Sequence, residues 1–101
     1  MSTKIKDVTK SQIFPAINSD KLALVVFHQK NCGACIMLEP VLEKLVEKMD
    51  VVVYKVDIHA DMSYTREVGI QGTPTILVYK HGVLSNTLVG YRSLDQLQKA
   101  L

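Results

Sequence analysis

Two short motifs, far apart in the sequence, constrain the fold of this chain more than its composition does. Cys32 and Cys35 lie two residues apart, between an apolar run over 22–27 and an amphipathic stretch that ends near Met49. The second motif, Gly72-Thr73-Pro74-Thr75, opens another apolar run. Two cysteines at this spacing near a helix N-terminus can exchange between dithiol and disulfide, because the helix end favours a thiolate. The first motif therefore predicts redox chemistry.

The periodicity of the apolar residues predicts alternating helices and strands. A capping box at 9–12 indicates a first helix, which Pro15 keeps short. Further helices are expected from 35 to about 49, over 62–68 with Gly69 as its cap, and from 94 onward. Strands are expected near Ile5 and over 22–27, 51–56, 75–80 and 83–89, the last two joined by a His81-Gly82 turn. This order predicts an α/β fold whose mixed sheet of four to five strands has helices on both faces.

The composition indicates one ordinary globular domain over residues 1–101. Apolar residues make up 48% of the chain and charged residues 22%, which suits a domain of this length. The net charge of +2 and the absence of long basic runs argue against nucleic acid or an anionic membrane as partner. The polar N-terminus has no signal-peptide core, so we expect a cytoplasmic protein, where structural disulfides are rare.

In this order and spacing, the motifs resemble thioredoxin over nearly the whole chain. Cys-Gly-x-Cys precedes Pro40 by five residues, residues 69–75 match the family's cis-proline segment, and Gly90 precedes the last helix as in the family. Glutaredoxins share the core but place the active cysteine nearer the N-terminus. The resemblance implies a thioredoxin fold that reduces protein disulfides without a cofactor or metal. It also implies a monomer reset by a reductase system similar to thioredoxin reductase.

The Cys-x-x-Cys pair suggests a division of roles. We expect Cys32 to be the more exposed cysteine and the nucleophile, with Lys30 adding positive charge nearby. Cys35 then attacks the mixed disulfide and releases the reduced target. Gly33 and Ala34, between the cysteines, adjust the reduction potential.

The resemblance assigns the second motif to target binding. It implies that the bond before Pro74 is cis and that this proline lies beside the cysteines. The backbone of Thr73 is expected to extend a target strand, whatever its side chain. Gly72 and Gly90 are expected to flank the same binding surface.

Three departures from the thioredoxin pattern bear on the mechanism. Asn31 stands in place of a tryptophan and Ala34 in place of a proline, while Val26 replaces a buried aspartate. The lysine that accompanies this aspartate aligns with Val53, so the proton acceptor for the second cysteine is missing. His28, expected on the same strand face as Val26, is a candidate base, although a histidine near such a site more often only packs, here in place of a tryptophan found in many thioredoxins.

Three other functions stay open at the level of sequence. The same fold can act as a disulfide oxidase or isomerase, which a reducing compartment disfavours. A metal-binding module would need more ligands at suitable spacing than the two cysteines and three histidines offer. A non-catalytic adaptor would use the fold only to hold a partner.

The dipeptide between the cysteines leads to a prediction for the reduction potential. Ala34 has an N–H that proline lacks, and this donor would stabilise the Cys32 thiolate. We expect a couple some tens of millivolts less reducing than the roughly −270 mV of thioredoxin. Titration of the pair in dithiothreitol and glutathione buffers, followed by thiol alkylation, measures this potential. A value at or below that of thioredoxin would contradict the prediction.

Overall fold

Five strands form one mixed sheet in the order β1-β3-β2-β4-β5. The computed structural model describes residues 3–101. The strands are β1 (Ile5–Asp7), β2 (Leu22–His28), β3 (Val52–Asp57), β4 (Thr75–Lys80) and β5 (Val83–Val89). β3 is parallel to both β1 and β2, whereas β4 is antiparallel to β2 and β5. The predicted mixed sheet is confirmed, including its edge strand near Ile5.

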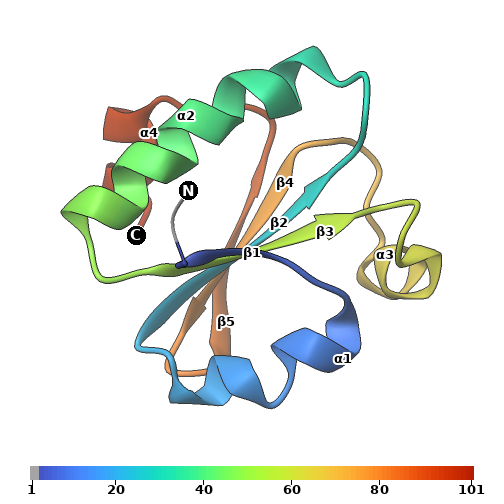
Figure 1. Ribbon diagram of the computed structural model, residues 1–101, viewed down its shortest axis with the longest axis horizontal. Helices are drawn as coiled ribbons and strands as arrows, with labels where there is room; N and C mark the ends of the chain where they lie inside the picture. The colour runs from blue at the N-terminus through green and yellow to red at the C-terminus, as the bar shows by residue number, and fades with distance from the viewer. Residues whose placement is uncertain (1–2) are drawn as a thin grey trace.

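Helices cover both faces of the sheet, as predicted (Figure 1). α2 (Gly33–Lys48) and α4 (Leu94–Lys99) lie on one face. α1 (Lys10–Ile13), a 3-10 turn over Ala16–Ser19 and α3 (Met62–Val68) lie on the other. α2 begins two residues earlier than its apolar periodicity indicates, because Cys32 caps it. No helix within residues 3–101 combines the length and the apolar character needed to cross a membrane.

Local signals at the ends of the elements act as the sequence predicts. Gln12 Oε1 accepts a hydrogen bond from Thr9 N–H at 2.9 Å, which fixes the start of α1. Gly69 ends α3 with a left-handed φ of 81°. His81 and Gly82, with φ values of 51° and 79°, form the tight turn between β4 and β5. Farther along β5, one additional residue forms a β-bulge opposite Val78 and Tyr79.

β2 is the central strand, and its side chains are buried on both faces. Leu24 and Val26 pack on the α2 side, whereas Val25 and Phe27 pack on the α1 side. A strand buried on both sides requires the continuous apolar run seen at 22–27. The carboxyl end of β2 therefore delivers the chain to the N-terminus of α2, where the two cysteines lie.

Gly82 and Gly69 provide a matched test of how the β4–β5 turn packs. Both have a positive φ, but a Cβ on Gly82 would lie 2.6 Å from Asn18 Oδ1 and 3.2 Å from Asn18 Cα, whereas one on Gly69 would meet nothing within 4 Å. We expect Gly82→Ala to lower the free energy of unfolding by about 3 kcal/mol and Gly69→Ala by about 1–2 kcal/mol. Urea unfolding measures both values. Equal losses would show that the contact with Asn18 relaxes without cost.

Candidate active site

The two cysteines lie at the start of α2 and form a disulfide. Their Cα atoms are 5.2 Å apart. Cys32 is the N-cap of α2, and its Sγ accepts a hydrogen bond from the Cys35 backbone N–H at 3.2 Å. Cys35 is buried, with 7% of its surface exposed, whereas Cys32 is partly exposed. Cys32 is therefore the more exposed of the two cysteines, as the sequence predicts.

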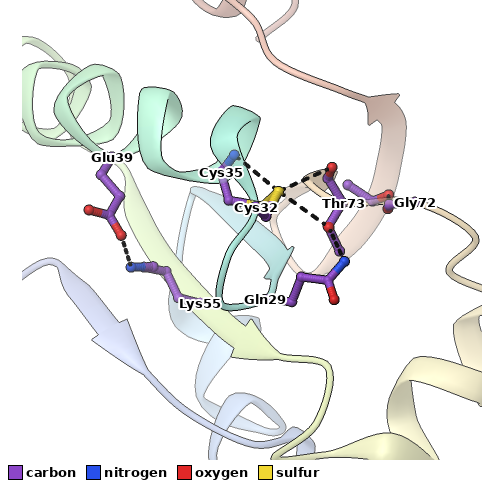
Figure 2. The surroundings of a disulfide bond; sticks show 8 residues. Gln29, Cys32, Cys35, Glu39, Lys55, Gly72 and Thr73 are labelled. Carbon is purple, nitrogen blue, oxygen red and sulfur yellow. Dashed lines mark hydrogen bonds and ion pairs between the residues drawn. A yellow bond between two sulfur atoms is a disulfide. The ribbon is translucent and has the colours of Figure 1, made fainter.

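The segment before β4 lies directly against Cys32. Figure 2 shows Thr73 facing the Cys32 sulfur, which is 3.5 Å from both Thr73 Oγ1 and the Thr73 carbonyl oxygen. The bond from Thr73 to Pro74 is cis, and Pro74 is buried. Gly90 N–H donates to Pro74 O at 2.8 Å, and Thr75 Oγ1 donates to Gly72 O at 2.6 Å. The structure thus places Thr73 of the second motif against Cys32, and Gly90 against Pro74 of the same motif.

Sequence reasoning did not identify Gln29, which also contacts this segment. Gln29 Nε2 donates to Thr73 Oγ1 at 2.8 Å (Figure 2). The only signal available was a polar residue directly after the apolar run of β2.

Lys30, which follows Gln29, is exposed. The amide that donates to the Cys32 sulfur in this disulfide form is that of Cys35, so a role for the Ala34 amide in the thiolate form stays a prediction.

The position on β2 six residues before Cys32 is the apolar Val26, but a lysine lies opposite it on β3. Val26 is 1% exposed and belongs to the core on the α2 side. The strand register pairs Val26 with Lys55, while Val53 pairs with Leu24 and is fully buried. Although the family resemblance aligned the lysine with Val53, β3 carries Lys55 opposite Val26.

Lys55 forms an ion pair with Glu39 of α2. Its Nζ lies 3.6 Å from Glu39 Oε1 on α2, one helical turn after Cys35, and only 16% of the Lys55 side chain is exposed (Figure 2). A partly buried ammonium is stabilised by such a partner, since desolvation disfavours an unpaired charge. The carboxylate is thus supplied by the helix that covers the sheet, rather than by β2.

His28 lies among charged side chains at the carboxyl ends of β1, β2 and β3. Burial lowers the pKa of its imidazole below the ordinary value, and the positive charge of Lys55 acts in the same direction. Asp57, Asp7 and Glu39 oppose this shift in pKa. His28 Nε2 is buried without a hydrogen-bond partner, and Asp7 Oδ1 lies 4.0 Å away. A histidine with a lowered pKa is neutral at neutral pH and has a nitrogen lone pair that accepts a proton.

Metal-ligating side chains do not gather in the part of the chain that the structure describes. Within residues 3–101, no group of three or more His, Cys, Asp or Glu side chains is placed to hold an ion.

Comparison with known proteins agrees with this geometry. The thioredoxin family model matches residues 4–101. The chain is 34% identical over 96 residues to a thioredoxin from Alicyclobacillus acidocaldarius subsp. acidocaldarius, covering 93% of this chain and 91% of that protein. It is 40% identical over 89 residues to mitochondrial thioredoxin from Mus musculus, covering 84% of this chain and 52%, about half, of that protein.

Comparison with solved structures also identifies a thioredoxin. A mutant thioredoxin from Halobacterium salinarum NRC-1 superposes with a TM-score of 0.90 at 27% identity, covering 99% of this chain and 90% of that one. The chain therefore belongs to the thioredoxin family, has the thioredoxin fold, and is a thiol–disulfide oxidoreductase that reduces protein disulfides through Cys32 and Cys35.

Proposed function

We propose that Cys32 is the attacking thiolate and Cys35 the resolving thiol of this reductase. The observation that carries the proposal is the unequal exposure of the two sulfurs, together with the Cys35 N–H that donates to Cys32 Sγ. A donor and a helix N-terminus stabilise negative charge on the Cys32 sulfur. Because Cys35 is buried, its sulfur would react only with a mixed disulfide already formed on Cys32.

The reaction proceeds in two exchanges. The Cys32 thiolate attacks a target disulfide, forming a mixed disulfide and releasing one target thiolate. Cys35 loses its proton, and its thiolate attacks the Cys32 sulfur; the Cys32–Cys35 disulfide forms and the second target thiolate leaves. Two electrons pass from the cysteine pair to the target, and the two cysteine protons balance the two new target thiols.

The segment around Pro74 would hold the target peptide. β4 begins to pair with β2 at Thr75, so the backbone of Thr73 lies outside the sheet ladder and can pair with an extended peptide. Gly72 and Gly90 flank it without side chains. Ile36 and Met37, 60% and 58% exposed in the first turns of α2, offer apolar surface beside Cys32.

The proposal extends to partners and compartment. The oxidised pair needs a dithiol donor, for which we propose a thioredoxin reductase-like system. The protein would act as a monomer in the cytoplasm, where thiol systems keep such pairs reduced. Recovery of disulfide-trapped targets from the cytoplasmic fraction of intact cells would support this location. Targets exclusive to another compartment would contradict it.

Replacement of each cysteine separates the two exchanges. Cys32→Ser should abolish reduction of insulin disulfides, because no exposed thiolate remains. Cys35→Ser should form the mixed disulfide but not resolve it, and should accumulate as a covalent adduct. Non-reducing gels and peptide mass spectrometry identify the adduct. An adduct that accumulates on Cys35 in the Cys32→Ser variant, with none on Cys32 in the Cys35→Ser variant, would reverse the roles.

Val26→Asp tests whether the missing acid limits the second exchange. The new carboxylate would lie opposite Lys55 and accept the Cys35 proton. Resolution of the mixed disulfide should accelerate about tenfold or more, while the free energy of unfolding falls by about 1–3 kcal/mol. Stopped-flow kinetics measure resolution, and Val26→Asn is the matched control without a base. An unchanged rate would assign the proton to His28, water or the target.

A further inference from the structure

The Thr73 hydroxyl contacts both the Cys32 sulfur and the side-chain amide of Gln29. Thr73 Oγ1 lies 3.5 Å from Cys32 Sγ, and Gln29 Nε2 lies 2.8 Å from the same Oγ1. These three groups come from the end of β2, the N-terminus of α2 and the loop before β4 (Figure 2). We call Gln29, Thr73 and Cys32 the relay.

The direction of the hydrogen bonds in the relay follows from the chemistry of its members. A threonine hydroxyl has one hydrogen to donate and lone pairs that accept. Gln29 donates an amide hydrogen to Thr73 Oγ1, which occupies a lone pair of the hydroxyl oxygen. The single hydroxyl hydrogen is then left to point at the sulfur, 3.5 Å away, a suitable distance for an O–H donor to sulfur.

We propose that Gln29 is a positioning residue for this reaction: by donating to Thr73 Oγ1, it directs the Thr73 hydroxyl hydrogen onto the Cys32 sulfur and so favours the Cys32 thiolate. The inference rests on the proposed role of Cys32 as the attacking thiolate. The hydroxyl hydrogen bond is weak to the sulfur of a neutral thiol and strong to a thiolate, since a charged acceptor roughly doubles its strength. This difference promotes ionisation of Cys32.

The carbonyl of Thr73 makes the direction of the hydroxyl matter more. This oxygen also lies 3.5 Å from Cys32 Sγ, and it can only accept a hydrogen bond. It therefore favours the protonated thiol over the thiolate. The backbone and the side chain of Thr73 act in opposite senses, and the orientation set by Gln29 decides which prevails.

Neither Gln29 nor Thr73 titrates, so a change at either residue leaves the ionisable surroundings of the cysteines as they are. α2 has no acidic residue in its first turn. The charged and titratable groups of the neighbouring elements are Lys30 in the preceding loop, Arg92 beside Gly90, Asp7 on β1, His28 on β2, Lys55 and Asp57 on β3, and Glu39 on α2.

The test follows the alkylation of Cys32 by iodoacetamide as a function of pH, in the full reduced chain. Peptide mass spectrometry separates modification of Cys32 from that of Cys35. Thr73→Val keeps the carbonyl and removes the hydroxyl, so the rate at neutral pH should fall about tenfold, with its midpoint at higher pH. Thr73→Ser should restore the wild-type profile. Gln29→Leu should shift the midpoint in the same direction, by less.

A double variant distinguishes a relay from two separate effects. If Gln29 acts through Thr73, Gln29→Leu combined with Thr73→Val should behave as Thr73→Val alone. Gln71→Leu is the matched control, because Gln71 is an exposed glutamine two residues before Thr73, and its profile should equal wild type. A wild-type profile for Gln29→Leu, or a further full shift in the double variant, would overturn the relay. Preferential alkylation of Cys35 in the wild type would instead overturn the proposed role of Cys32.

Discussion

β4 pairs antiparallel with β2, in a register that runs from Leu22 opposite Lys80 to Phe27 opposite Thr75. Because the two strands run in opposite directions, the start of β4 lies beside the end of β2. The start of β4 carries the cis-proline segment, and the end of β2 leads to the cysteines. The whole site depends on this one pairing, since about forty residues separate Cys32 from Thr73 in the sequence.

Much of the fold was predictable because local signals and burial agree along this chain. The hairpin from Thr75 to Val89 was placed correctly, since its turn residues separate two β-type runs. The start of α2 was placed late, because apolar periodicity begins only at Cys35, whereas a helix begins at its cap. The existence and the order of the helices and strands of the sheet could thus be predicted from the sequence. The start of α2 could not, because it is fixed by the sulfur of Cys32.

The site was less predictable than the fold. Val53 and Lys55 differ by two residues, so they share a face of β3, and alternation cannot distinguish the two registers. Packing decides between them: Val53 is fully buried, whereas Lys55 reaches Glu39. Gln29 had no pattern to identify it, because its partner Thr73 is remote in sequence. Contacts between single polar side chains become visible only when the chain is folded.

The bulge in β5 bears on how this protein behaves at high concentration. β5 is an edge strand with exposed apolar side chains, Val83 at 68% and Val89 at 62%. Such an edge presents unpaired backbone groups that can template the addition of another chain. The extra residue opposite Val78 and Tyr79 bends the strand and increases its twist, so a straight incoming strand matches only part of its length. One inserted residue thereby makes this edge of the sheet a poorer template for pairing with another strand.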